Sequence, residues 1–203
     1  MNSETKIDIR RLFYTVLGIA ILGAGVALAV RAGLGTSPLD VLIELVHFKI
    51  GISVGRLTFF CQVMMVVIAL ILWPKTIGIG TVMAMFLTQF PIDLVYDLVG
   101  TYDSFYINLF LCVIGTALTA FGAAVIIRAG LGMGTYEALT FSISNRFKIK
   151  YLYVKYGLEA IFLLLLILFH GTIGIGTLIS YLFLGKLITV FIPVTEKWIS
   201  FPD

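Results

Sequence analysis

The sequence predicts an all-α polytopic membrane protein: six transmembrane helices plus two short re-entrant half-helices, arranged as two inverted three-span repeats. The 203-residue chain is 60% hydrophobic and only 12% charged, whereas a soluble domain has about 25% charged residues. A chain of this size cannot hide so much apolar surface in its own interior, so lipid must cover part of it. The pentapeptide Arg-Ala-Gly-Leu-Gly at 31–35 also returns unchanged at 128–132, which indicates a duplication.

A second motif has almost the same spacing as the first. Thr-Ile-Gly-Ile-Gly-Thr at 76–81 recurs 96 positions later at 172–177, and the pentapeptide recurs after 97 positions. We therefore expect residues 1–100 to form the first membrane repeat and residues 101–203 the second, within a single integral membrane domain. The Gly-Ile-Gly segments themselves are expected to be tight structural turns rather than ligand-binding loops.

Six apolar segments approach the ~20 residues needed to cross the hydrocarbon core of a bilayer. They are 12–30, 55–73 and 80–99 in the first repeat, and 109–127, 152–169 and 176–194 in the second. Gly18 and Gly25 lie two turns apart on one face of the first segment and allow another helix to approach closely. That other helix can belong to the same chain or to a second copy, so a homodimer remains open.

A short helix is predicted to follow each pentapeptide. At 38–48, Ser37 is a candidate N-cap, Pro38 suits the first turn, and Asp40 can complete a capping box. At 135–146, Gly134 or Thr135 is the cap, and Glu137 aligns with Asp40. About a dozen residues reach only half-way through a bilayer, so we expect half-helices rather than spans.

An odd number of spans in each repeat makes the two repeats inverted relative to one another. The positive-inside rule places the basic tail 1–11 and the basic connection 128–155 in the cytoplasm, and the acidic link 97–104 outside. Both termini are then cytoplasmic. The 31–56 connection fits less well, because it would be outside yet carries Arg31, Lys49 and Arg56; burial of Arg31 in the protein would reduce the conflict.

Residues 31–40, Arg-Ala-Gly-Leu-Gly-Thr-Ser-Pro-Leu-Asp, and the later Pro-Ile-Asp at 91–93 resemble the YczE/YyaS/YitT-type bacterial integral membrane proteins. The resemblance covers most of the chain and implies a location in the bacterial cytoplasmic membrane. It implies no settled substrate or mechanism. The second repeat has Met-Gly-Thr at 133–135 where the first has Thr-Ser-Pro at 36–38, so the two half-sites are expected to differ chemically.

Inverted repeats with broken helices are typical of secondary transporters, whose substrate sites lie where half-helix N-termini and unwound backbone face a cavity. Helix N-termini and arginines both favour anions. We therefore expect a small permease for a small anionic solute. Its central site is expected where the two Arg-Ala-Gly-Leu-Gly segments, called the joints below, meet. The predicted substrate-binding residues are Arg31, Gly33, Gly35, Thr36, Ser37, Asp40, Arg128, Gly130, Gly132, Gly134, Thr135 and Glu137.

Four ionisable residues are candidates for gating or proton coupling: Asp40, Asp93, Glu137 and Lys186. Each also has a structural interpretation. Asp40 and Glu137 can act as helix caps, Asp93 can be a buried hydrogen-bonding group, and Lys186 can reach the lipid headgroups.

The two arginines likewise have a structural alternative. Arg31 and Arg128 can pair with the acidic residues that follow the joints and lock the repeats together, and Arg128 can also reach the headgroups. The basic run at 146–155 is expected to set topology against anionic lipid.

No nucleotide-binding loop, catalytic triad or metal-ligand cluster is present in the sequence, which argues against an enzyme, a cofactor, a metal site and nucleic-acid binding. Cys61 and Cys112 are expected to be small buried apolar residues. The expected partners are therefore the lipid bilayer and a small-molecule solute. Two other functions stay open: a substrate-binding membrane subunit of an ATPase-powered uptake system for a vitamin or metabolite, and a non-transporting membrane scaffold.

Overall fold

The computed structural model describes residues 8–171 and 173–199, and these residues form helices and connecting loops without strands. The predicted tail at 1–11 lies mostly outside the described residues. In the described part of the chain, six helical segments are long and apolar enough to cross a membrane, which agrees with the six predicted spans. The elements are α1 (Ile9–Arg31), α2 (Pro38–Ile50), α3 (Val54–Leu72), η1 (Pro74–Thr76), α4 (Ile79–Leu87), α5 (Gln89–Leu98), α6 (Phe105–Ala129), α7 (Thr135–Phe147), α8 (Tyr151–Leu168) and α9 (Ile175–Trp198).

The span predicted at 80–99 differs from the others because the structure divides it into α4 and α5 at Thr88. Pro91 has no amide hydrogen to donate to the preceding turn, and its ring crowds the carbonyl group four residues earlier. The Thr88 hydroxyl donates to the Ala84 carbonyl at 2.6 Å, and a side-chain bond of this kind often bends a helix. The two short helices together still make one apolar segment from Ile79 to Leu98.

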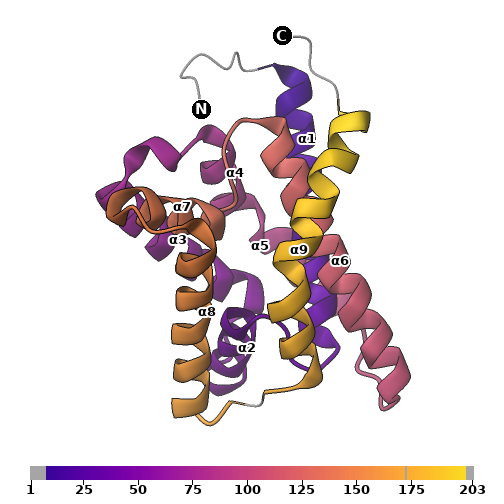
Figure 1. Ribbon diagram of the computed structural model, residues 1–203. Coiled ribbons are helices and arrows are strands. Elements are labelled where there is room, and N and C mark those ends of the chain that lie inside the picture. The colour runs from indigo at the N-terminus through magenta and orange to yellow at the C-terminus, as the bar shows by residue number, and fades with distance from the viewer. Residues whose placement is uncertain (1–7, 172, 200–203) are drawn as a thin grey trace.

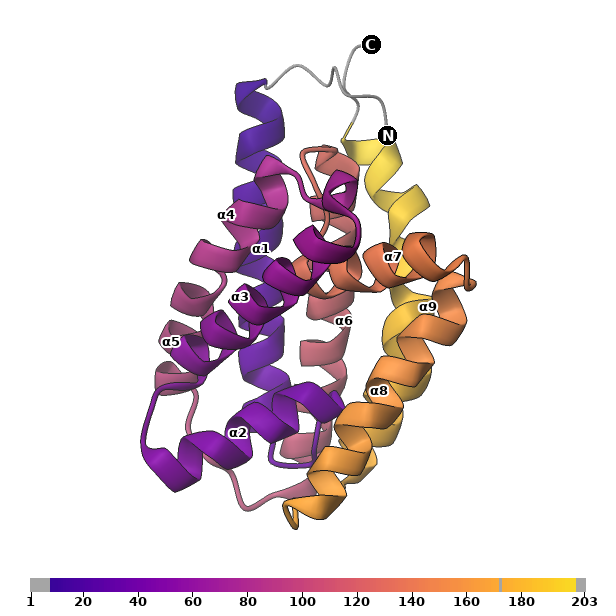
Figure 2. The same ribbon diagram turned by 90° about the vertical axis from the view of Figure 1, so that its left-hand side faces the viewer.

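Helices α1 and α6 run in opposite directions and pack against each other along their length (Figure 2). Glycines at the contact let the two backbones meet. A Cβ atom on Gly25 would lie 2.7 Å from the Gly115 carbonyl oxygen, and a Cβ atom on Gly122 would lie 2.7 Å from that of Gly18. The predicted small-residue face of α1 therefore serves packing inside the chain.

The remaining helices flank this central pair. Helix α5 contacts α1, α9 contacts α6, and α3 packs against α5 and α7, while α8 packs against α2 and α7. In Figure 1, α3, α7, α8 and α2 lie on the left of the molecule and α1, α6 and α9 on the right. The start of α1 and the end of α9 lie at the same end of the molecule, as an even number of spans requires.

Helices α2 and α7 have 13 residues each, or about 20 Å of helix, which is shorter than the ~30 Å hydrocarbon core. Both run across the direction of α1 and α6. Helix α2 lies near the lower end of the molecule and α7 lies in the upper half (Figure 2). They are the two short helices that the sequence predicts after the pentapeptides.

Each Gly-Ile-Gly turn binds the pentapeptide joint of the other half of the chain. The Gly80 amide donates to the Leu131 carbonyl at 2.8 Å, and the Gly176 amide donates to the Leu34 carbonyl at 2.9 Å. The first amides of a helix have no partner within that helix, so the joint carbonyls satisfy them. The turns have a structural role, as predicted. The sequence did not show that their hydrogen bonds connect the two halves of the chain.

Candidate functional site: a central cavity at two helix N-termini

The first side of the site is the start of α2. The Ser37 side chain accepts the Asp40 amide at 3.3 Å, and the Ser37 hydroxyl donates to the Asp40 carboxylate at 2.7 Å. Ser37 is therefore the N-cap, as predicted. The expected capping box is incomplete, because the short Asp40 side chain accepts the Ser37 hydroxyl, whereas the longer glutamate or glutamine of a full box accepts the backbone amide of the cap.

The second side is the start of α7. Gly134 is the N-cap, and Thr135 is the first helical residue and makes no capping bond with its side chain. The Glu137 carboxylate folds back toward Gly134, so close that a Cβ atom on Gly134 would clash with Glu137 Oε2. It therefore lies beside the unpaired amides at the start of α7, where a negative charge is stabilised.

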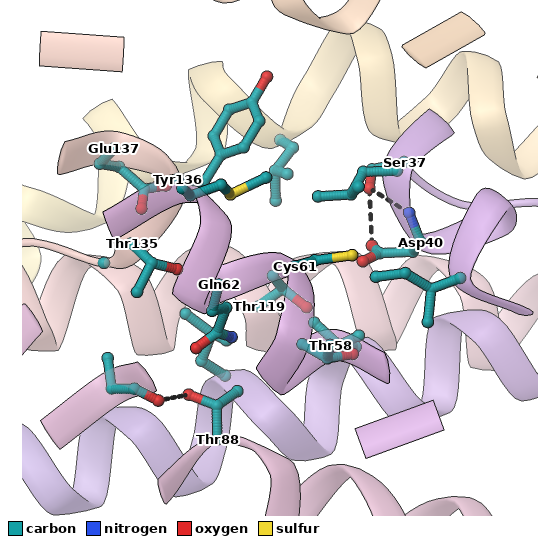
Figure 3. Close-up of a pocket in the computed structure, with 18 of the residues that line it drawn as sticks. Ser37, Asp40, Thr58, Cys61, Gln62, Thr88, Thr119, Thr135, Tyr136 and Glu137 are labelled. Carbon is teal, nitrogen blue, oxygen red and sulfur yellow. Dashed lines mark hydrogen bonds between the residues drawn. The ribbon is translucent and has the colours of Figure 1, made fainter. Parts of the chain in front are cut away.

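The two N-termini open on one cavity of about 130 Å³. Figure 3 shows Ser37 and Asp40 on one side and Thr135 and Glu137 on the other, with Gln62 between them. Residues from α1 through α9 line it. Most of the lining is apolar: Leu22, Val26, Leu39, Ile43, Met65, Ala84, Ile92, Ile126, Phe162 and Leu184.

Burial disfavours the charged form of the Asp40 side chain. It raises the pKa of the Asp40 carboxyl to about 6, and the hydrogen bond from Ser37 opposes this rise.

Two further charged side chains in the cavity were missed by the sequence analysis. Lys155 and Glu159, one turn apart on α8, are each only 6% exposed. We expected Lys155 to face lipid headgroups in the basic connection, so that expectation is wrong. The available signal was a lysine and a glutamate four residues apart in an apolar span, since ionisable residues in such spans usually face the protein interior.

Several buried polar atoms in this cavity have no hydrogen-bond partner within residues 8–171 and 173–199. They are Gln62 Oε1, Glu159 Oε2 and the Tyr136 hydroxyl. Buried polar atoms are paired in more than nine cases out of ten. Three unpaired atoms around a single cavity are unusual, and they make this cavity the candidate functional site.

The structure does not bring Arg31 and Arg128 together, and neither lines the central cavity. Arg31 Nε donates to the Val99 carbonyl at 2.7 Å, and its guanidinium group lies 4.6 Å from the centre of the Tyr96 ring. Arg128 Nε donates to the Ile199 carbonyl at 3.2 Å. The arginines hold the ends of the two long helices to neighbouring segments.

The structural alternative predicted for the two arginines was an ion pair with the acidic residues that follow the joints. Within the described part of the chain, Arg31 forms no ion pair with Asp40 or Glu137; Arg128 instead pairs with Glu196 at 3.5 Å. Arg31 is half-buried, which reduces the charge conflict noted for the 31–56 connection.

The backbone residues of the predicted site are divided between different places. Gly134 lines the central cavity, whereas Gly33 lines a second cavity of about 300 Å³ beside Arg31. Thr36 is buried at 4% exposure and lines neither cavity. The remaining joint glycines, Gly35, Gly130 and Gly132, adopt positive φ angles and shape the turns without lining either cavity.

Asp93 and Lys186 lie outside the cavity. Asp93 accepts the Gly55 amide at 2.7 Å and the Ser53 hydroxyl at 2.9 Å, so it anchors the start of α3. Lys186 is exposed on α9, with its Nζ 6.0 Å from the centre of the Phe183 ring. In the described part of the chain no three His, Cys, Asp or Glu side chains are grouped so that they could hold a metal ion.

These features define a multi-pass helical membrane protein with a mainly apolar central cavity that carries a few buried polar groups. The chain belongs to the family of unknown function DUF6198, whose family model matches residues 9–193. This confirms the resemblance that the 31–40 motif indicated.

Three curated relatives match nearly the whole chain. The "Uncharacterized protein YyaS" of Bacillus subtilis is 34% identical over 92% of this chain and 94% of its own length. An "Uncharacterized protein" of Haemophilus influenzae is 26% identical over 90% and 83%, and the "Uncharacterized membrane protein YczE" of Bacillus subtilis is 25% identical over 98% and 92%. No solved structure matches the chain.

Proposed function

We propose that this protein is a small secondary transporter that moves a small solute through the central cavity and catalyses no chemical reaction. One observation carries the proposal: the N-termini of two short helices, α2 and α7, open on one cavity that both halves of the chain line. Short helices that end inside the protein leave polar backbone at membrane depth, which is tolerated where it lines a cavity. Transporters place their substrate at such helix ends.

The contacts between the halves support an inverted repeat. Gly18 and Gly25 of α1 correspond to Gly115 and Gly122 of α6 at the 97-residue spacing. Gly18 packs on Gly122, and Gly25 packs on Gly115, so equivalent positions exchange partners, as a two-fold axis requires. The hydrogen bonds between the Gly-Ile-Gly turns and the joints exchange partners in the same way. On this basis α2 and α7 are re-entrant half-helices that enter from opposite faces.

Charge supports one orientation in the bacterial cytoplasmic membrane. The start of α1 carries Arg10 and Arg11. The exposed last turn of α7 carries Arg146, and the exposed α7–α8 connection carries Lys148 and Lys150. In Figure 1 the start of α1 lies at the end of the molecule where α9 finishes, and the α7–α8 connection lies at the upper end of α8. By the positive-inside rule that end, with both termini, faces the cytoplasm.

Transport is tested with the purified protein in liposomes, by recording solute-driven currents or fluxes for a panel of small amines, amino acids and carboxylates. At least one solute is expected to move faster than in protein-free liposomes. If no member of a broad panel does so in folded, correctly inserted protein, the transporter proposal is wrong, and a scaffold role gains support. Transport that appears only when an ATPase co-purifies would instead favour a subunit of an ATPase-powered system.

The two native cysteines offer a matched control for the route through the cavity. Cys61 lines the cavity, whereas Cys112 is fully buried in α6 and does not. A thiol reagent should therefore reduce flux in Cys112→Ala, which keeps Cys61. In Cys61→Ala the reagent should have no effect, so that the treated and untreated proteins give the same flux. Equal sensitivity of the two variants would place the route elsewhere.

A further inference from the structure

The unpaired atoms of the cavity point to the charge of its ligand. Glu159 is 6% exposed, and its Oε2 has no partner in the described part of the chain; the same is true of Gln62 Oε1. Carboxylate and amide oxygens accept hydrogen bonds and cannot donate them in these states. A ligand that satisfies both atoms must therefore bring hydrogen-bond donors.

The helix N-termini do not supply a free anion site, although the sequence suggested one. Each carries its own carboxylate in its first turn: Asp40, bound to the Ser37 hydroxyl in α2, and Glu137, folded over Gly134 in α7. These carboxylates already take the place beside the positive ends of the two helices. A second anion there would meet a like charge.

The charges around the cavity have the same consequence. Among residues 8–171 and 173–199, three carboxyl groups line it (Asp40, Glu137 and Glu159) and one ammonium group, that of Lys155. No arginine of these residues lines it. A buried carboxylate without a matching cation is strongly unfavourable, so a positively charged ligand would stabilise this arrangement and a negatively charged one would not.

Size limits the ligand further. The cavity of about 130 Å³ is close to the ~150 Å³ apolar cavity that accepts benzene in another protein. We propose that the cavity binds a small organic ammonium ion of about six non-hydrogen atoms, with its ammonium group on Glu159 and Gln62 and its apolar body against Ile92, Ile126 and Phe162. This inference rests on the proposed function and names the substrate class.

Lys155 is the competitor of such a ligand. It precedes Glu159 by one helical turn and acts on it electrostatically without forming an ion pair within 4 Å. Its Nζ lies 3.0 Å from where a Cβ atom of Gly185 would be, so the glycine in α9 leaves room for the ammonium group. Ligand and Lys155 then share one carboxylate, and departure of the ligand lets Lys155 approach it.

The test uses matched probes on the full-length protein in detergent, with binding measured by calorimetry. n-Pentylammonium, 1-pentanol and pentanoate have the same five-carbon skeleton and differ in the charge of the head group. We expect n-pentylammonium to bind at least about tenfold more tightly than either of the others. Glu159→Gln and Gln62→Leu should each weaken its binding, the first by about tenfold or more because it removes a charged acceptor. Glu196→Gln, an exposed glutamate on α9, is the matched control and should leave binding unchanged.

Lys155→Met gives a change in the opposite direction. Removing the competing cation should tighten n-pentylammonium binding. L-Norvaline carries a carboxylate beside the same ammonium group. If it binds more tightly than n-pentylammonium and loses that advantage in Lys155→Met, the ammonium ligand is an amino acid, which supports the inference.

The inference is overturned if pentanoate binds and n-pentylammonium does not. It is also overturned if n-pentylammonium binds no more tightly than 1-pentanol, or if a folded Glu159→Gln protein binds it as tightly as the wild type does. Transport in liposomes of a solute without an ammonium group, with no amine binding, would overturn the inference and leave the transporter intact. Amine binding without flux of any solute would leave the site intact and overturn the transporter.

Discussion

Replacing Gly25 by alanine tests how closely α1 and α6 pack. The new Cβ atom would lie 2.5 Å from the Thr119 amide nitrogen and 2.7 Å from the Gly115 carbonyl oxygen. Both neighbours are backbone atoms of α6, so no side chain can rotate out of the way. An ordinary contact of 3.4 Å would require the helices to separate locally by about 0.9 Å.

The expected cost follows from this separation. Inserting a methyl group into a well-packed contact costs about 1–3 kcal/mol, and a clash with rigid backbone belongs at the upper end of that range. For a chain of this length about 3 kcal/mol lowers the melting temperature by roughly 6–12 °C. Gly122→Ala should behave similarly, because its Cβ atom would lie 2.5 Å from the Leu22 amide nitrogen.

Gly157→Ala is the matched control. Gly157 lies on an exposed face of α8, and a Cβ atom there meets nothing within 4 Å. Alanine forms helix better than glycine by about 1 kcal/mol, so this variant should melt at or slightly above the wild-type temperature. Thermal unfolding of the wild type and the three variants in one detergent, followed by circular dichroism, makes the comparison.

The packing argument is wrong if Gly25→Ala and Gly157→Ala melt together at the wild-type temperature. A change in oligomeric state without a change in melting temperature would instead mean that Gly25 faces a second copy of the chain. Size-exclusion chromatography with light scattering, run on the same samples, separates these two outcomes.

Three further predictions concern the ends of helices. Asp93→Ala should destabilise the protein by about 2 kcal/mol in chemical unfolding, because it leaves the Gly55 amide and the Ser53 hydroxyl without their acceptor, and Asp93→Asn should cost less. If both variants unfold alike, the carboxylate does not hold α3. Arg128→Gln should change stability by less than about 1 kcal/mol, since its pair with the exposed Glu196 is weak; a larger loss would mean that its bond to the Ile199 carbonyl dominates. A fluorescent protein fused to the C-terminus should fluoresce in a bacterial host and an alkaline phosphatase fusion there should be inactive, whereas the reverse pattern would contradict a cytoplasmic C-terminus.

The local features of the fold were predictable from neighbouring residues. Ser37 caps α2 because its side chain reaches an amide three residues away, and that relation is visible in the sequence. The same holds for the six spans, whose length and hydropathy follow from consecutive residues. The split at Thr88 was missed although Pro91 lies in the segment, because apolar composition alone does not show where a helix bends.

The candidate site was predictable only in part. Ser37, Asp40, Thr135 and Glu137 were identified because they begin the half-helices, and all four line the cavity. Arg31 and Arg128 were expected beside these four residues because each arginine is the first residue of a joint. They lie instead at the carboxyl ends of α1 and α6, and they bond to the carbonyls of Val99 and Ile199.

Membrane insertion, the number of spans, the duplication and the helix caps all followed from the chain itself, because each depends on residues that are close in sequence or on a direct comparison of two segments. Which polar groups share a cavity depends on how helices almost a hundred residues apart pack together. Only the folded chain brings Lys155 and Glu159 of α8 beside Gln62 of α3 and the starts of α2 and α7. Side-chain neighbours across helices are set by close packing of whole faces, and local sequence carries no direct record of that packing.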